Sequence, residues 1–158
     1  MTKLCISLFL SFSICSLSSG AALAQERGQQ VKMAELPAAA QKTVREQSQG
    51  AKIEELSKVV EKDKTIYIVE MTINGRTKEA LLDPDGKVVA LEEQIAMEAL
   101  PSAAKAGIEW EAGDGKVMKV ESITKGDAVV GYEAHIKRDG KLTEIRVGLD
   151  GKLITKEE

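Results

Sequence analysis

Residues 31–44 read VKMAELPAAAQKTV, and residues 95–108 read IAMEALPSAAKAGI. At an offset of 64 residues, the two segments match in a methionine, a Leu-Pro step, an Ala-Ala pair and a closing β-branched residue. An internal repeat of this kind indicates that one structural unit of roughly 60 residues occurs twice in the chain. The repeat therefore predicts the architecture, and by itself it says nothing about chemistry.

The correspondence extends through the rest of the chain. The further matches are Lys52-Ile53 with Lys116-Val117 at an offset of 64, Val69-Glu70 with Tyr132-Glu133 at 63, Asn74-Gly75 with Asp139-Gly140 at 65, and Asp85-Gly86-Lys87 with Asp150-Gly151-Lys152 at 65. The offset changes near turn residues, where a chain accepts insertions at little cost. We therefore expect two extra residues near the second hairpin, at Lys137 and Arg138.

The first 24 residues are typical of a secretory signal peptide. Lys3 supplies a positive charge, residues 4–17 are mostly apolar, and Ala22-Leu23-Ala24 forms an A-x-A cleavage site. The apolar stretch is shorter than the ~20 residues that a membrane span needs. An uncleaved anchor and lipidation at Cys15 are the alternatives. We expect cleavage after Ala24 and a periplasmic or secreted mature protein.

Removal of the signal peptide leaves 134 residues with 21 basic and 25 acidic side chains, a net charge of −4. This balance argues against nucleic acid or anionic lipid as the main partner. Both cysteines leave with the signal peptide, so the mature chain has no disulfide or thiol chemistry. No later segment has the length and hydropathy of a membrane span. The aromatic residues of the mature chain are Tyr67, Trp110 and Tyr132. A unit of about 60 residues with so few aromatic residues buries little apolar surface alone, so we expect the two units to pack together.

Each unit is predicted to begin with a helix. Leu36, Ala40 and Val44 recur at helical spacing, and the second copy repeats this pattern. Pro37 and Pro101 suit the first turn of a helix, where a missing N–H group costs nothing. Short helices over residues 31–34 and 92–99 are expected before them, each ending at the Leu-Pro step.

A meander of antiparallel strands is predicted after each helix. The first strand, near residues 52–61, has apolar residues at every third position, which favours a β-bulge or a strand with both faces partly covered, with a helical extension as the alternative. The second strand alternates cleanly over residues 67–73 and leads into an Asn-Gly hairpin. A third strand and an Asp-Gly-Lys turn then lead to a short last strand over residues 88–91. The counterparts in the second copy are residues 116–125, 130–136 and 153–155.

The predicted fold class is α+β, with two tandem helix-plus-antiparallel-meander units whose helices pack on one face of the sheet. The predicted boundaries are residues 1–24 for the signal peptide, 25–91 for the first unit and 92–158 for the second. The sequence pattern does not decide whether the two units share one continuous sheet.

These residues resemble the pattern of PepSY and PepSY-like domains, which are secreted or membrane-tethered bacterial modules. The resemblance covers residues 31–158 and comprises the Leu-Pro helix start, a Tyr-x-Val or Tyr-Glu strand, the Asn-Gly or Asp-Gly hairpin and the Asp-Gly-Lys turn. The family's fold is similar to one half of the β-lactamase inhibitory protein, itself a tandem repeat. The resemblance implies non-enzymatic binding, with regulation or inhibition of peptidases, and supplies no catalytic residues. This chain departs from the inhibitor in lacking cysteines and most aromatic residues, which a tight inhibitory surface usually needs.

Two residues that the repeat does not duplicate are candidates for partner contact. His135 is the only histidine, and strand alternation points it away from the core. We expect it to be exposed and to bind no metal, because a lone histidine seldom makes a metal site. Trp110, whose counterpart at the offset is Glu46, is expected either to anchor a partner or, preferentially, to cap the core at the end of its helix.

The remaining charged motifs are assigned structural roles. Asp83-Pro84-Asp85-Gly86 lacks the further ligands of a calcium loop and predicts a turn. Glu70 matches Glu133, and Glu79 matches Glu144; nearby lysines and arginines favour cross-strand ion pairs over acid–base catalysis. The sequence therefore predicts no catalytic residue, no cofactor and no metal ligand.

The predicted function is that of an exported, non-enzymatic binding module of PepSY-like type. Its partner is expected to be a protein or peptide in the periplasm or extracellular space, such as a peptidase or another envelope protein that it regulates or inhibits. The alternative is a small-ligand or cation-responsive envelope protein, because the acidic balance favours cations.

Overall fold

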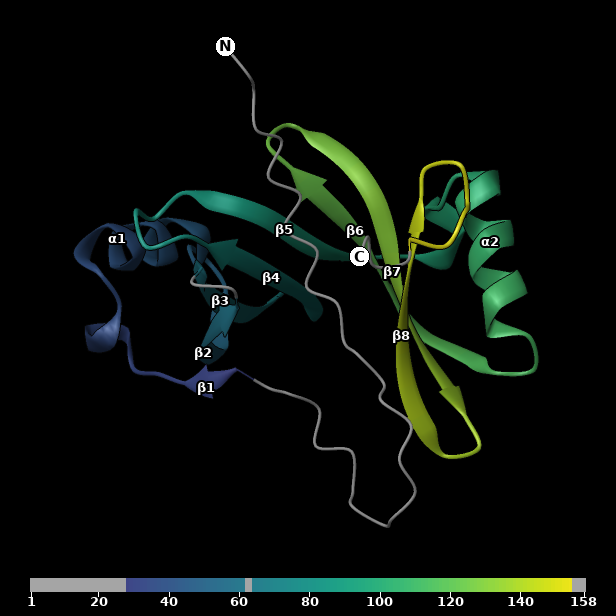
Figure 1. The fold of residues 1–158 in the computed structure, drawn as a ribbon, viewed down its shortest axis with the longest axis horizontal. Coiled ribbons are helices and arrows are strands. Elements are labelled where there is room, and N and C mark those ends of the chain that lie inside the picture. The colour runs from purple at the N-terminus through teal and green to yellow at the C-terminus, as the bar shows by residue number, and fades with distance from the viewer. Residues whose placement is uncertain (1–27, 62–63, 155–158) are drawn as a thin grey trace.

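The computed structural model describes residues 28–61 and 64–154 (Figure 1). The predicted signal peptide and its cleavage site after Ala24 lie outside these ranges. In the part of the chain that is described, no helix is long and apolar enough to cross a membrane.

The described strands form one eight-stranded antiparallel sheet whose order follows the chain. They are β1 (Gln29–Gln30), β2 (Lys52–Glu61), β3 (Lys64–Ile73), β4 (Arg76–Leu82), β5 (Val88–Ile95), β6 (Lys116–Lys125), β7 (Ala128–Arg138) and β8 (Lys141–Gly148). Each strand pairs with the strands before and after it, so the sheet is an uninterrupted meander (Figure 1).

This sheet shows that the prediction of two tandem helix-plus-meander units was wrong, and β5 is the reason. Residues 92–95, expected to begin a short helix, extend β5 instead. One edge of β5 pairs with β4, as in Leu81↔Ala90, and the other pairs with β6, as in Ile95↔Val120. The backbone N–H and C=O groups on both edges of β5 therefore form hydrogen bonds within a single sheet. Local periodicity reports the faces of a strand and does not report how its edges are filled.

The first long strand of each unit contains the expected β-bulge, and the helical alternative was wrong. The pairing register shifts after Ile53 in β2 and after Val117 in β6. Of the last strand predicted for the second unit, residues 153–155, the part that the structure describes ends at residue 154 and forms only an isolated bridge, Val147↔Leu153. The final strand of the first unit thus became the central β5, whereas its counterpart contributes one bridge.

A second irregularity in the β6–β7 pairing explains how the repeat offset changes. Val130 is skipped where the register shifts, and beyond it the strand pairing makes Tyr132 the counterpart of Tyr67, at an offset of 65. The predicted offset of 63 in this strand was therefore wrong. The extra residue of the second copy is Val130, within the bulge, and not Lys137 and Arg138 near the hairpin.

The two copies of the sequence repeat within this single sheet, residues 28–91 and 92–154 of the described chain, are still called the first and second unit. Each has one α-helix preceded by a short 3-10 helix. The α-helices are α1 (Ala38–Gln47) and α2 (Ser102–Ala112), and the 3-10 helices are η1 (Met33–Glu35) and η2 (Met97–Ala99). Leu36 and Leu100 separate the two in extended conformation, with ψ of 148° and 140°. Each leucine precedes a proline, whose ring disfavours the helical conformation at that position.

Both helices cover the same face of the sheet. Val44 of α1 and Ile108 of α2 are fully buried in two hydrophobic clusters beneath their helices. Leu91 packs in the cluster under α1 and Ile95 in the cluster under α2. These two residues lie on one face of β5, because side chains four positions apart in a strand point the same way.

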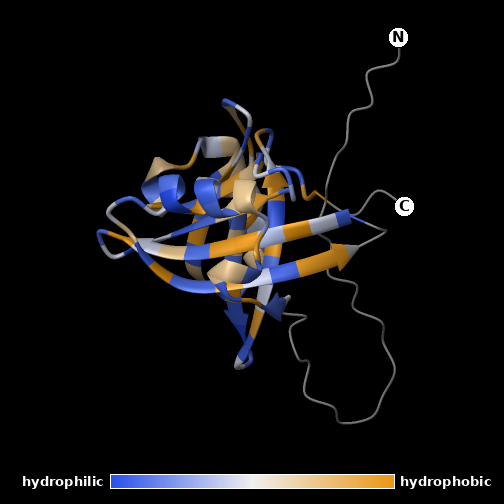
Figure 2. Cartoon of the chain, turned by 90° about the vertical axis from the view of Figure 1, so that its left-hand side faces the viewer, coloured by the Kyte–Doolittle hydropathy of each residue, from blue (hydrophilic) through white to orange (hydrophobic). Residues whose placement is uncertain are grey.

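The opposite, helix-free face differs between the two units. In the first unit it carries a third buried apolar cluster, made by Ile66, Ile68, Leu81 and Ala90. In the second unit the same face carries charged side chains. The alternation of hydrophobic and hydrophilic residues along the strands is visible in Figure 2, where orange and blue segments follow one another.

The predicted turns are present. Asn74 and Asp139 adopt left-handed conformation with φ of 52° and 51°, as the two hairpins require. The segment beginning at Asp83 is a turn as predicted: Gly86 N–H donates to the Asp83 carbonyl at 2.9 Å, and Lys87 N–H donates to Asp83 Oδ1 at 2.9 Å. These turns connect β3 to β4, β4 to β5 and β7 to β8, which are strands of the helix-free face.

The last turn of each unit packs against that unit's helix. In the first unit, the Thr43 hydroxyl donates to the Gly86 carbonyl at 2.6 Å. In the second unit, Gly107 occupies the matching helix position, and a Cβ atom there would lie 2.0 Å from the Gly151 carbonyl oxygen. The second helix therefore approaches its turn so closely that only a glycine fits.

Replacing this helix glycine tests the close approach. An ordinary Gly→Ala change within a helix stabilises a protein, but Gly107→Ala should destabilise this one by about 1–3 kcal/mol, because the new methyl group overlaps backbone. Urea unfolding measures the change, with the exposed Glu109→Ala on the same helix as control. A gain in stability for Gly107→Ala would contradict the packing described.

The continuous sheet predicts that the units unfold together. Met71, which is 1% exposed, lies in the cluster under α1, and Met71→Ala should cost about 2–5 kcal/mol. Because β5 belongs to both halves, the substitution should also accelerate hydrogen exchange of the α2 amides. Ile136→Ala is the reciprocal variant in the second unit. Protection of α2 that is unchanged by Met71→Ala would mean that the units are independent.

Candidate functional site

Charged side chains from four neighbouring strands meet on the helix-free face of the second unit. Glu92 lies in β5, Glu121 in β6, Glu133 and His135 in β7, and Arg146 in β8. Glu121 lies opposite Glu133, which lies opposite Arg146. Strand alternation thus brings all five onto one face, and we call them the charged cluster.

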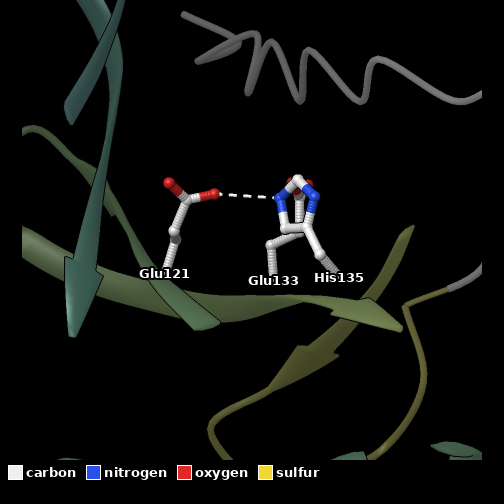
Figure 3. A group of neighbouring side chains, drawn as sticks. All are labelled: Glu121, Glu133 and His135. Atoms are coloured by element: carbon white, nitrogen blue, oxygen red, sulfur yellow. Dashed lines mark hydrogen bonds and ion pairs between the residues drawn. The ribbon is translucent and has the colours of Figure 1, made fainter. Parts of the chain in front are cut away.

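One nitrogen of the His135 imidazole contacts the carboxylates of both Glu121 and Glu133, and Figure 3 marks the contact with Glu121 by a dashed line. This nitrogen, Nε2, is 3.1 Å from Glu121 Oε2 and 3.2 Å from Glu133 Oε1. The other ring nitrogen, Nδ1, is 3.4 Å from Glu144 Oε1. Both ring nitrogens therefore face carboxylate oxygens.

The second oxygen of each carboxylate is held by another side chain. Glu121 Oε1 accepts a hydrogen bond from the Thr77 hydroxyl at 2.7 Å and lies 2.9 Å from Lys119 Nζ. Glu133 Oε2 accepts from Arg146 Nε at 2.5 Å. Each carboxylate is thus fixed through one oxygen and directs the other oxygen to His135.

The same network connects the two units. Thr77 belongs to β4, in the first unit, whereas Glu121 belongs to the second. Arg146 of β8 also connects β7 and β5 on this face, because its Nε atom contacts Glu133 and its Nη2 atom donates to Glu92 Oε1 at 3.0 Å. These contacts position the charged cluster at the place where the units join.

Burial makes the pairing energetically necessary. Glu92, Glu121 and Glu133 are each only 4% exposed. A buried ion costs several kcal/mol unless other charges and hydrogen bonds compensate it. Within the described ranges every buried side-chain nitrogen or oxygen has a hydrogen-bond partner. The cross-strand ion pairing predicted for Glu133 is therefore present, but in a buried network and not at the solvent surface.

The two carboxylates shift the protonation of His135. Burial opposes its charged form, but hydrogen bonds to Glu121 and Glu133 outweigh this effect and raise the pKa of His135 to about 9. In the same way, the contacts with His135, Lys119 and Thr77 overcome burial and lower the pKa of Glu121 to about 2. The imidazole is consequently a cation at neutral pH.

Beside the cluster, three carboxylates lie in a row across neighbouring strands. Glu70 of β3 is opposite Glu79 of β4, which is opposite Glu92 of β5. Burial and repulsion from Glu92 and Glu70 raise the pKa of Glu79 to about 8. Burial and repulsion from Glu133 raise the pKa of Glu92 to about 7, although Arg146 opposes the rise. At neutral pH a substantial fraction of the Glu79 and Glu92 carboxyls is therefore protonated, which lowers the negative charge of this row.

The structure changes the predictions for the two candidate contact residues. The side chain of His135 is only 15% exposed, so the expectation of an exposed histidine was wrong. Trp110 is 84% exposed on α2, so the favoured role as a core cap was also wrong. The two residues lie on opposite sides of the sheet, and the structure does not bring them together.

Sequence reasoning missed Glu121 and Glu92 as members of this site. The bulge near Val117 reverses the alternation along β6, and placing it there would have assigned Glu121 to the helix-free face. Glu92 was missed because residues 92–99 were predicted to form a short helix, whereas Glu92 lies in β5. In the structure, carboxylate oxygens of Glu121 and Glu133 and a ring nitrogen of His135 lie within 4.8 Å of one another. Such a group can hold a proton, as an ion triad, or a metal ion.

The raised pKa of Glu79 predicts a pH-dependent stability difference. Between its ordinary pKa of 4.5 and its folded value of about 8, the folded state holds a proton that the unfolded state releases, so stability falls as pH rises. Glu79→Gln removes this titration and should be more stable than the parent chain at pH 9, by at least about 1 kcal/mol, but not at pH 4. Urea unfolding at both values measures this, with exposed Glu98→Gln as control. Equal differences at both pH values would contradict the assignment.

Comparison with solved structures identifies proteins of the same fold. A candidate periplasmic protein from Bacteroides eggerthii DSM 20697 has a TM-score of 0.58 at 15% identity, covering 77% of this chain and 88% of its own. A DUF2874 family protein from Bacteroides ovatus ATCC 8483 has a TM-score of 0.54 at 14% identity, covering 76% and 85%. A BLIP-like protein from Bacteroides fragilis NCTC 9343 has a TM-score of 0.50 at 16% identity, covering 77% and 85%.

At these identities the likeness extends to the fold alone. It supports a BLIP-like fold for this chain, as the family resemblance predicted. No family model matches the sequence, and no curated protein matches it. Membership of the PepSY-like family therefore stays a prediction.

Proposed function

We propose that this chain is an exported, non-enzymatic binding module that engages a protein or peptide partner in the periplasm. Three observations support this function: the signal-peptide pattern of residues 1–24, the fold shared with a candidate periplasmic protein, and the fold shared with a BLIP-like protein. In this proposal residues 25–91 and 92–158 are the two PepSY-like repeats of the mature protein.

The distribution of exposed hydrophobic side chains carries the proposal. Of the eight large hydrophobic residues that are exposed within the described ranges, seven lie between Trp110 and Leu153, in the second unit. The exception is Val60 in β2. These seven residues belong to α2, β6, β7, β8 and the segment after β8, and singly exposed hydrophobic residues are normal on a protein surface. The proposal therefore depends on the residue with the largest exposed aromatic side chain.

Trp110 is this residue and is the proposed anchor for the partner. Its indole is 84% exposed on α2, and the first unit has Glu46 at the corresponding position. Tryptophan is among the residues that contribute most to protein–protein affinity, because a partner's pocket buries its large aromatic surface. The second unit is therefore the proposed contact surface, and the first unit supports it through the shared sheet.

A catalytic role has little support from the charged cluster. The carboxylates of Glu121 and Glu133 are each engaged by cationic side chains, and His135 is a cation at neutral pH. A general base needs a free lone pair directed at a substrate. A binding function accounts for the exposed surface without requiring one.

A capture experiment tests the proposal. The mature chain, immobilised and exposed to an envelope extract of its host, should retain one partner reproducibly, and Trp110→Ala should weaken that retention by more than about tenfold. The matched control is Val60→Ala, an exposed hydrophobic residue of the first unit, which should retain the partner as the parent chain does. Retention that is equal for Trp110→Ala, or absent for the parent chain, would reject the proposed surface. If the partner is a peptidase, loss of its activity on titration with the mature chain supports regulation, and unchanged activity rejects it.

A further inference from the structure

The donor atoms around His135 point to a function that the protein-binding proposal does not include. The geometry points to a site for one divalent transition-metal ion, of the Zn²⁺ type, with Glu121, Glu133 and His135 as ligands. This inference rests on different residues, and on the opposite side of the sheet, from the surface around Trp110.

The separations of the donor atoms fit such an ion. Zn²⁺ binds nitrogen and carboxylate oxygen at about 2.0–2.2 Å, so two ligand atoms of a tetrahedral site lie roughly 3.3–3.5 Å apart. In the structure His135 Nε2 is 3.1 Å from Glu121 Oε2 and 3.2 Å from Glu133 Oε1. All three donor atoms lie within 4.8 Å of one another, so small side-chain movements would place an ion between them.

The surrounding side chains orient each ligand as they do in metal sites. Ligating histidines commonly donate their other ring N–H group to a carboxylate, which fixes the tautomer. Here Glu144 Oε1 lies 3.4 Å from His135 Nδ1 and leaves Nε2 as the ligand atom. Arg146 holds the far oxygen of Glu133, and Thr77 holds the far oxygen of Glu121. These supports are already in place before an ion binds.

Charge and ligand type indicate which ion the site would select. Two carboxylates supply negative charge on the side that faces His135, and a divalent ion there would share them with Lys119, which lies 2.9 Å from Glu121, and Arg146, which lies 2.5 Å from Glu133. On binding, the proton on Nε2 passes to solvent and the nitrogen lone pair coordinates the ion. A mixed nitrogen and oxygen donor set suits Zn²⁺ or Co²⁺, whereas Ca²⁺ takes six to eight oxygen ligands. Three protein ligands leave a coordination position for water.

The single histidine makes the test direct. The mature chain, carrying no histidine tag, is titrated with Zn²⁺ by calorimetry and by NMR of the His135 ring, and with Co²⁺ by visible absorption. We expect one ion per chain, saturable movement of the His135 ring signals, and the absorption of a tetrahedral Co²⁺ site. Absence of 1:1 binding, or a His135 ring that does not respond to Zn²⁺, would overturn the inference.

Variants distinguish this site from adventitious binding. His135→Gln and Glu121→Gln should abolish detectable Zn²⁺ binding, and circular dichroism establishes that they are folded. Glu144→Gln should lower affinity by about 10–100-fold, because it orients the ligand without contacting the ion. Its counterpart in the first unit, Glu79→Gln, is the matched control and should bind as the parent chain does. Zn²⁺ binding that survives His135→Gln, or Ca²⁺ binding that is tighter than Zn²⁺ binding, would show that the ion is held elsewhere or differently.

Discussion

The pairing of β5 on both of its edges is the constraint on which the rest of the structure depends. Its hydrogen bonds to β4 and β6 convert a duplicated sequence into one sheet. They also fix the phase of every following strand, because side chains on paired strands share a face. The helices are consequently forced onto one side, and the polar residues of the second copy onto the other. A break in β5 would separate the two copies and disperse the charged cluster.

Side-chain hydrogen bonds add a second connection between the copies. The Thr77 hydroxyl of β4 supports Glu121 of β6, so one unit helps to position the central carboxylate of the other. Buried charges of this kind contribute little net stability, but removing one partner leaves another uncompensated. The charged cluster therefore contributes mainly by fixing the positions of the Glu121 and Glu133 carboxylates and the His135 ring, and not by stabilising the fold. The neighbouring Glu79 also shows the cost of burial, since burial raises its pKa to about 8 and keeps that carboxyl mostly protonated at neutral pH.

Features with a local physical cause could be predicted from the sequence. The Leu-Pro step separates the 3-10 helix from the α-helix, and Asn74 and Asp139 adopt the positive φ that their hairpins need. The single sheet could not be predicted, because nothing local in residues 92–95 reveals that β6 fills the second edge of β5. The site was missed for a related reason. A one-residue bulge reverses which face the following side chains occupy, so the phase of Glu121 depended on a feature that periodicity locates only approximately.

The strand pairing also records how the duplicated copies have diverged. With the offset of 65 that holds beyond Val130, Glu133 and Arg146 of the second copy correspond to Ile68 and Leu81 of the first. One copy therefore has a hydrophobic pair where the other has an ion pair, on backbones that are otherwise equivalent. The helix-covered side repeats its residues because both copies must pack a helix. The other side has no helix to pack, so the identity of its residues is not constrained in the same way and differs between the copies.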